Sequence, residues 1–513
     1  MVGISTVHEI AQTLRNASVR QSRLSWAQYT TGFDFGLAEA YDAVVAILSD
    51  KKNFDAICQF RDNAVEAVDT RTAHILFRAF EPFHLSKELN DLAKNMQKKV
   101  RELSAVLNTH RTIFEGSQIT DTDLTQIITN DTNRERRKSA FLARAQVNKP
   151  LVDAGFIELL DMRKDYARLY GASSFTAMQL ERQELHADMF ADWAGDVREI
   201  LPIMNRVRKE MAEKFCNTSS LQPWDGGFVS ANIAPSLQTP VNLTKFYEYI
   251  KPFFLQFGFD LDSYNITYDL FSRRNKSEWG YNFPIETAKD SRILANVKDQ
   301  YQEFRVLLHE TGHAVHSFLN DPDSVVFNMG ISGIITEGLA KFFDGFLYRP
   351  VFYGQFFGDR MDSVQQEFDA LRRWTSVNSL RAISDILFDQ RLYTTDIKTI
   401  DDIHALYWKT YTEILGEEPY AEIPPWAYRI HHTTHPIYLH NYLMGDIACE
   451  MFEKTFLSQN GYPSADGHFN ELGAFLYESV IKPSGRYPFP ELFERISGKK
   501  FSLSFVTDEV KKM

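Results

Sequence analysis

The stretch "RVLLHETGHAVHSF" at residues 305–318 places two histidines four residues apart, with a glutamate directly after the first. Residues i and i+4 lie on one face of an α-helix, so His309 and His313 can reach the same point in space. Glu310 is rotated by about 100° from His309 and lies beside that point. Most other residues of the stretch are apolar, which predicts a buried helix. Buried imidazole and carboxylate groups need partners, because leaving them unpaired costs free energy.

A metal ion is one such partner. Zinc favours imidazole nitrogen and carboxylate oxygen, and a catalytic zinc site has three protein ligands and one open position for water. Gly312, between the two histidines, would let another backbone come close. The alternative interpretation is a pair of core histidines that are hydrogen-bonded to their neighbours. The motif is too short to decide between the two, so the rest of the sequence has to supply a third ligand.

A second helix is predicted over "ISGIITEGLAKFFDGF" at residues 331–346, with Thr336 as its N-cap. Glu337 follows His313 by 24 residues, which is enough for a turn-rich loop and a return helix. Asp344 lies seven residues further on the same face and could accept a hydrogen bond from a ligating imidazole. An ordinary exposed helix acid is the alternative interpretation of Asp344.

Histidines and tyrosines are dense in "YRIHHTTHPIYLHNYL" at residues 428–443. If a metal at the histidine motif hydrolyses peptides, the reaction forms an oxyanion. Hydrogen-bond donors opposite the metal would stabilise that oxyanion. We single out His432, Tyr438 and Tyr442 as such donors. The two tyrosines are four residues apart and share a face if residues 436–452 are helical. An aromatic core stripe is the alternative interpretation.

Most of the chain is predicted to be helical, and the apolar share of 44% allows a sizeable core. The spacing of apolar residues predicts helices over 91–110, 152–171 and 189–215, the last with a break or kink at Pro202. Residues 291–298 are the best strand candidate. The fold class is therefore mainly α, with a small sheet close to the histidine motif.

The stretch 217–242 is rich in prolines and glycines and predicts a connection between two lobes. We expect an N-terminal helical lobe over 1–216 and a catalytic lobe over 243–513. The two lobes can interleave as one unit.

Charge and composition exclude several classes of partner. A net charge of −12 argues against nucleic acid and against an anionic membrane as the main partner. The N-terminus has no basic and apolar signal pattern, and no stretch approaches eighteen apolar residues. Cys58, Cys216 and Cys449 are odd in number and far apart, as expected in a reducing compartment. The sequence therefore predicts a soluble cytoplasmic protein and gives no indication of its oligomeric state.

The motifs "HETGHAVH" and "EGLAKFFD" together resemble the oligoendopeptidase F and thimet oligopeptidase family of gluzincin zinc metallopeptidases. The pattern of that family is H-E-x-G-H-x-x-H followed by E-x-x-S/A-x-x-x-E. The resemblance implies one Zn²⁺ per chain, held by His309, His313 and Glu337. It also implies that Glu310 is the general base and that Asp344 is the second acid, one methylene shorter than in the family pattern.

Further segments resemble the same family. "KSEWGY" (276–281) and "ILANV" (293–297) are similar to segments before the zinc helix. The second implies an edge strand that pairs with bound peptide through Ala295 and Asn296. In "RIHHTTHPIYLHNYLMG" (429–445), counting back from Gly445 places His432 on the family's histidine proposed to bind the substrate backbone or oxyanion, and Tyr438 and Tyr442 on tyrosine positions. Here the chain departs from the family, because "HHTTHP" lacks an aromatic pair and His440 replaces a tyrosine.

The resemblance implies a two-lobed helical shell around a deep central channel that admits short unstructured peptides. A related family, the angiotensin-converting-enzyme-like branch, shares the site geometry and releases C-terminal dipeptides. Arg429 could bind a substrate carboxylate bidentately, and a substrate-facing histidine at 431 rather than 432 would favour that interpretation. The hypothesis is thus a zinc-dependent endopeptidase of oligopeptides. The alternatives are a dipeptidyl carboxypeptidase, a hydrolase of a specialised non-peptide amide, and a non-catalytic peptide-binding or scaffold protein.

Overall fold

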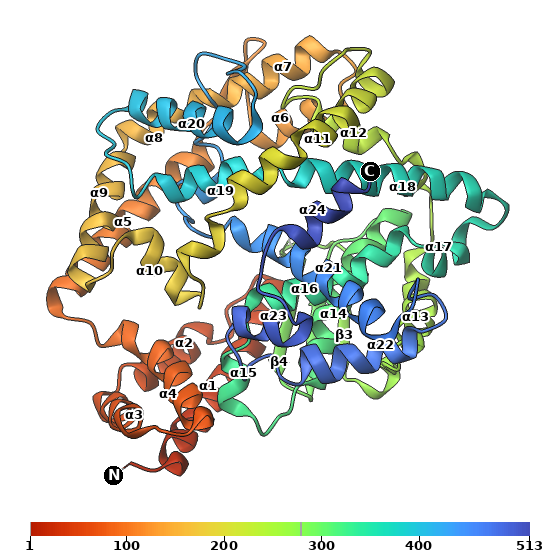
Figure 1. Ribbon diagram of the computed structural model, residues 1–513. Coiled ribbons are helices and arrows are strands. Elements are labelled where there is room, and N and C mark those ends of the chain that lie inside the picture. Colours follow the sequence, from red (N-terminus) through yellow and green to blue (C-terminus); the bar gives the residue numbers. More distant parts are fainter. Residues whose placement is uncertain (1, 278–279) are drawn as a thin grey trace. The chain divides into compact units, whose positions relative to one another are not determined.

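The computed structural model describes residues 2–277 and 280–513, and these form two compact units that are each assembled from three segments (Figure 1). Unit 1 comprises residues 1–85, 236–361 and 444–501. Unit 2 comprises residues 86–235, 362–443 and 502–513. One boundary falls inside the turn-rich stretch 217–242, but the units do not follow the contiguous lobes expected from the sequence. The chain returns to each unit.

Unit 1 contains the histidine motif. Its helices and strands are α1 (Ile4–Thr31), α2 (Leu37–Leu48), α3 (Lys51–Asn63), α4 (Ala67–Phe80), α13 (Phe246–Gln256), β3 (Ile266–Asp269), β4 (Tyr281–Glu286), β5 (Asp290–Leu294), α14 (Phe304–Leu319), α15 (Val325–Met329), α16 (Gly333–Asp344), α17 (Pro350–Phe357), α22 (Phe469–Phe475) and α23 (Phe489–Ser497). Helix α21 (His440–Asn460) begins in unit 2 and continues into unit 1.

Unit 2 is almost entirely helical. Its elements are α5 (Lys87–Thr109), β1 (Thr112–Phe114), β2 (Ser117–Ile119), α6 (Asp121–Asn130), α7 (Arg134–Ala143), α8 (Asn148–Asp153), α9 (Phe156–Tyr170), α10 (Phe175–Arg182), α11 (Trp193–Cys216), α12 (Gly226–Asn232), α18 (Met361–Ser379), α19 (Ala382–Arg391), α20 (Ile400–Leu415) and α24 (Ser504–Lys511). The mainly α fold class is confirmed. No helix within the described residues is both long and apolar enough to cross a membrane.

The long helices lie close to where the apolar spacing predicted them. Gly171 ends α9 in the left-handed conformation (φ +88°), which glycine adopts without steric cost. The expected break at Pro202 is wrong, since α11 continues through it. Proline removes one main-chain hydrogen bond, and the buried face of α11, including Ile200 and Met204, still holds the helix in place.

A three-stranded sheet lies next to the histidine helix, in the order β3-β5-β4. Strand β3 is parallel to β5, and β4 is antiparallel to it. Helix α14 contacts both β4 and β5. The hydroxyl groups of Tyr268 on β3 and Thr311 on α14 lie 3.1 Å apart in hydrogen-bond contact, which ties the helix to the sheet.

Helices α14 and α16 pack closely against each other in unit 1 (Figure 1). A Cβ atom at Gly312 would lie 3.1 Å from the Cα atom of Ala340 and 3.0 Å from Cδ2 of Phe343. Small residues at the crossing therefore let the two backbones approach. The N-cap of α16 is Ser332, whose hydroxyl accepts from the N–H of Ile334 at 3.2 Å, so the expected cap at Thr336 is wrong.

Candidate metal centre

His309 and His313 lie one turn apart on α14, and both side chains are largely buried. Their ring centroids are 4.8 Å apart and the ring planes are nearly perpendicular. The apolar residues of the helix are buried around them, including Leu308 and Val315. Burial fixes the helix, and the helix in turn presents both imidazoles at one place.

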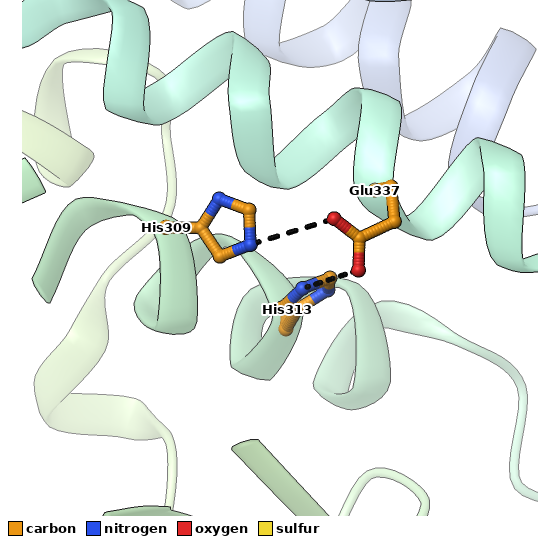
Figure 2. A group of neighbouring side chains, drawn as sticks. All are labelled: His309, His313 and Glu337. Atoms are coloured by element: carbon orange, nitrogen blue, oxygen red, sulfur yellow. Dashed lines mark ion pairs between the residues drawn. The ribbon is translucent and has the colours of Figure 1, made fainter. Parts of the chain in front are cut away.

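Glu337 reaches the two histidines from α16, as Figure 2 shows. Its Oε2 atom lies 3.6 Å from Nε2 of His309, and its Oε1 atom lies 3.7 Å from Nε2 of His313. One donor atom from each residue lies within 4.8 Å of the others. Within the described ranges, 2–277 and 280–513, no other group of histidine, cysteine or acidic side chains has such geometry.

The donor set fits a zinc ion. Two imidazole nitrogens and one carboxylate oxygen are the ligands of many catalytic zinc sites, which leave a fourth position open. Ligand atoms around a tetrahedral zinc at its usual bond lengths are about 3.4 Å apart, close to the separations found here. Burial lowers the pKa of His313 to about 3, with a further contribution from His309. His313 is therefore neutral at physiological pH, which is the form that binds a metal.

Asp344 lies at the end of α16, beside the other nitrogen of His309. Its Oδ2 atom is 3.0 Å from Nδ1 of His309, so an N–H at Nδ1 can donate to the carboxylate, which would leave the lone pair on Nε2 for a metal ion. Burial disfavours the charged imidazole and is the largest single effect. The hydrogen bond with Asp344 and the negative charges of Asp344, Glu310 and Glu337 together outweigh it and raise the pKa of His309. The carboxylate of Asp344 is largely buried, with Arg305 3.7 Å away. Asp344 is thus not an ordinary exposed acid.

Glu310 is buried next to the cluster and is not one of its three donors. Burial raises its pKa to about 7, although the neighbouring His309 and the backbone N–H of Asn282, which donates to its carboxylate, act in the opposite direction. A carboxyl group with a pKa near 7 can take up and release a proton at neutral pH. Its position beside the metal ligands is where a base for the attacking water is needed.

The expected edge strand at 293–297 is wrong. Strand β5 lies in the middle of the sheet and pairs with β3 on one side and β4 on the other. Ala295 follows β5, where its N–H donates to Asp269 and its C=O accepts from Lys276. The Asn296 side chain donates to Ser277. These groups are engaged within unit 1 rather than free for a peptide.

The edge strand beside Glu310 is β4, which the sequence analysis missed. Its apolar residues hardly alternate, but Pro284 is a signal for an edge, because proline cannot donate to a neighbouring strand. Asn282 of β4 contacts Glu310 directly. Residues 278–279 of the "KSEWGY" segment lie outside the described residues.

Tyr438 and Tyr442 form an aromatic cluster with His431 in unit 2. The ring of His431 is stacked with that of Tyr438 at 6.1 Å and is perpendicular to that of Tyr442 at 5.7 Å. Both tyrosines are about half exposed, so this is not a core stripe. Helix α21 begins only at His440, and therefore Tyr438 precedes it, contrary to the expected helix over 436–452.

His432, by contrast, is fully buried in unit 2. Its Nδ1 atom lies 3.2 Å from the carbonyl oxygen of Trp426, and its ring is perpendicular to that of Phe388. Burial lowers the pKa of His432 to about 4. Of the two neighbouring histidines, His431 is the one that a ligand can reach, and the role of either in catalysis stays a prediction.

Arg429 already has partners. Its guanidinium lies 3.4 Å from a carboxylate oxygen of Asp385, and its Nε donates to the hydroxyl of Tyr428. Its expected role as the anchor of a substrate carboxylate stays a prediction, and Asp385 would compete with that carboxylate.

Known proteins share the fold of this chain. An M32 carboxypeptidase from Deinococcus radiodurans R1 superposes with a TM-score of 0.69 at 13% identity, over 99% of this chain and 98% of the other. PZ peptidase A, solved with an inhibitor, has a TM-score of 0.66 at 15% identity, over 99% and 96%. A Bacillus anthracis str. Ames protein described as an oligoendopeptidase F has a TM-score of 0.65 at 15% identity, over 99% and 90%. At these identities the likeness is one of fold.

No curated protein matches the sequence significantly. Residues 263–511, however, match the family model of peptidase family M3. The matched region carries His309, Glu310, His313, Glu337 and Asp344. The match therefore identifies residues 263–511, which carry the candidate metal centre, as a region of peptidase family M3, and the whole chain shares its fold with the peptidases above.

Proposed function

We propose that the protein is a zinc-dependent endopeptidase that hydrolyses short unstructured peptides. The observation that carries the proposal is the cluster of His309, His313 and Glu337, with the buried carboxylate of Glu310 beside it. A zinc ion held by the three residues would lower the pKa of a bound water and polarise the scissile carbonyl. The family assignment supports peptidase activity in general.

Glu310 carries the proton transfers in this proposal. Its carboxylate takes a proton from the attacking water and delivers it to the nitrogen of the leaving amine as the peptide bond breaks. Burial raises the pKa of this carboxylate, which favours its uptake of the proton from the water. Asp344 holds the imidazole of His309 in the orientation and tautomer that a metal ligand needs.

The peptide would bind in an extended conformation along an edge strand, since main-chain hydrogen bonds recognise a peptide whatever its sequence. Strand β4 is the edge next to Glu310, and it replaces the segment at Ala295 and Asn296 in this role. Tyr442, with Tyr438 or the neighbouring histidines, would donate to the oxyanion.

Release of C-terminal dipeptides is the second candidate. It needs a cation for the terminal carboxylate of the substrate, and Arg429 is the residue proposed for it. The ion pair of Arg429 with Asp385 favours internal cleavage, because a second carboxylate would have to compete with Asp385. A protein that binds peptides without cleaving them would not need the buried Glu310.

Digestion of a peptide library, followed by mass spectrometry, distinguishes these functions. Endopeptidase activity predicts internal cuts in peptides with free and with amidated C-termini at similar rates. A product set of C-terminal dipeptides that disappears on amidation would indicate the carboxypeptidase. Unchanged peptides in the presence of one bound zinc per chain would indicate the binding protein.

A further inference from the structure

Unit 1 contains a cavity of about 340 Å³ that is separate from the three metal-ligating residues. Helices α1, α2, α4 and α15 and the end of strand β4 line it. Its volume lies at the lower end of the range for small-molecule sites, roughly 300–1,000 Å³. The apolar part of the wall includes Leu14, Val19, Val44, Leu48, Val325 and Met329.

Arg15 is the unusual group in this wall. Its Nη1 donates to the carbonyl oxygen of Pro322 at 3.0 Å. Its Nη2 is buried and has no hydrogen-bond acceptor among the described residues. The nearest carboxylate oxygen with which it pairs, on Glu286, is 3.8 Å away. A buried charged donor without an acceptor costs free energy, and a negative charge held in the cavity beside the guanidinium would offset part of that cost.

The charges at this end of the cavity are unbalanced. Glu286 is shared by Arg15, by Arg23 at 3.2 Å and by Lys289 at 2.8 Å. Three cations therefore surround one carboxylate. Arg23 and Lys289 are largely exposed and can be solvated, whereas Nη2 of Arg15 cannot. This part of the site has electrostatic complementarity to one additional negative charge.

We propose that the cavity binds a small amphipathic carboxylate, with its apolar chain against Leu14, Leu48 and Met329 and its carboxylate beside the guanidinium of Arg15. Two sources share this chemistry: a free aliphatic acid, and the C-terminal residue of a short apolar peptide. The site does not use the metal cluster, so its occupancy is measured by binding and does not depend on peptidase activity.

Isothermal titration of the full chain with decanoate tests the aliphatic source, and decanol is the uncharged control. The wild-type protein should bind decanoate at one site and bind decanol at least ten-fold more weakly. Arg15→Gln should weaken the binding of decanoate by about ten-fold, the value of one charge-assisted hydrogen bond. The affinity for decanol should not change. Arg20→Gln, on the exposed face of the same helix and outside the cavity, is the matched control.

Ser22→Phe provides a second variant that leaves Arg15 intact. Ser22 lines the cavity, and a phenyl ring there should block decanoate while the thermal melting curve stays cooperative. The peptide source is tested with acetyl-Leu-Leu and its C-terminal amide. Binding of the free acid that is lost in Ser22→Phe and is absent for the amide would assign the site to peptide termini. Binding of decanoate alone would assign it to aliphatic acids.

Three results would overturn the proposal. One is the absence of binding for decanoate and for the peptide acid at millimolar concentration. Another is equal affinity for the charged and uncharged ligand in the wild-type protein. The third is binding that persists in a folded Ser22→Phe variant, since that binding would lie elsewhere on the chain.

Discussion

The backbone of Gly312 on α14 lies against Ala340 on α16, so closely that a Cβ atom at Gly312 would be 3.1 Å from Cα of Ala340. This approach is what brings Glu337, three residues before Ala340, within 3.7 Å of both histidines. The metal centre therefore depends on the absence of a side chain at a position that binds nothing itself.

Gly312→Ala should push the two helices apart. Alanine favours the helix by about 1 kcal/mol, but overpacking of a close contact costs about 1–3 kcal/mol, so the net stability should fall slightly. Zinc affinity should fall about ten-fold, because Glu337 moves away from the histidines. Gly333→Ala is the control, since a Cβ there meets no atom within 4 Å. Zinc affinity is measured by competition with a chelator, and equal affinities of both variants would contradict the packing argument.

Asp344→Asn should weaken zinc binding by about 10–100-fold, because the amide no longer raises the basicity of the His309 ring. The amide oxygen of asparagine can still accept the hydrogen bond, so the fold should be retained. Asp344→Glu, which restores the acid, should recover most of the affinity. Chelator competition reports the affinity, and full affinity in Asp344→Asn would show that the contact with His309 does not tune the metal site.

Stability of the metal-free protein should depend on the ionisation of His316. This residue is buried on α14, its Nε2 lies 3.0 Å from the hydroxyl of Ser484, and burial lowers its pKa to about 4. In the unfolded chain the pKa is about 6.5, so the unfolded state binds more protons between pH 6.5 and 4. The contribution of neutral His316 to the free energy of unfolding is therefore complete above pH 6.5. As the pH falls toward 4 this contribution is lost, and the free energy of unfolding decreases by about 3 kcal/mol.

His316→Gln should remove that part of the pH dependence and still donate to Ser484. Urea unfolding of the protein in a chelator, between pH 7 and 4, measures it. His8→Gln, at an exposed position on α1, is the control. If the variant loses stability with falling pH as steeply as the wild type does, the buried neutral form of His316 is not the cause.

His431 and His432 should respond differently to the same substitution. His431→Asn should lower kcat with little loss of stability, because its ring lies in the half-exposed cluster with the two tyrosines. His432→Asn should destabilise the protein by about 1–3 kcal/mol, because it disrupts a buried contact. Kinetics and thermal unfolding separate the two effects, and the reverse outcome would show that His432 is the residue that faces the substrate.

Tyr442→Phe removes the hydroxyl group and keeps the ring in the aromatic cluster. A loss of one oxyanion donor reduces kcat by about 10²–10³-fold. Zinc content should not change, and the exposed Tyr41→Phe on α2 is the matched control. Full kcat in Tyr442→Phe would remove this hydroxyl from the mechanism.

The cluster of His309, His313 and Glu337 could be predicted from the sequence, because helix periodicity alone places the two histidines together. Glu337 followed from a second helix of the right spacing, and the structure brings its carboxylate to both rings. The edge strand could not be predicted in the same way. The apolar run at 291–298 is the mark of a strand buried on both sides, and β5 is indeed the central strand. The boundaries of the two units depend on contacts between distant segments, which local patterns do not contain.

The sequence also could not show which of the two histidines, His431 or His432, is accessible to a ligand. His431 and His432 are neighbours with the same chemistry, and only the short 3₁₀ helix Ile430–His432 turns one outward and the other into the core. Likewise, Thr336 has the residue type of an N-cap, but the cap is formed four residues earlier by Ser332. Such choices depend on packing rather than on residue type.

The central claim is that Glu310 acts as the base beside a zinc ion that other residues hold. It is tested by measuring zinc per chain and the rate of peptide hydrolysis on the same preparation of Glu310→Gln. We expect one zinc per chain in this variant, as in the wild type, with hydrolysis reduced by at least about 10²-fold. Glu248→Gln, at an exposed position of unit 1, should retain both. If Glu310→Gln with its zinc bound hydrolyses peptides at the wild-type rate, Glu310 is not the base.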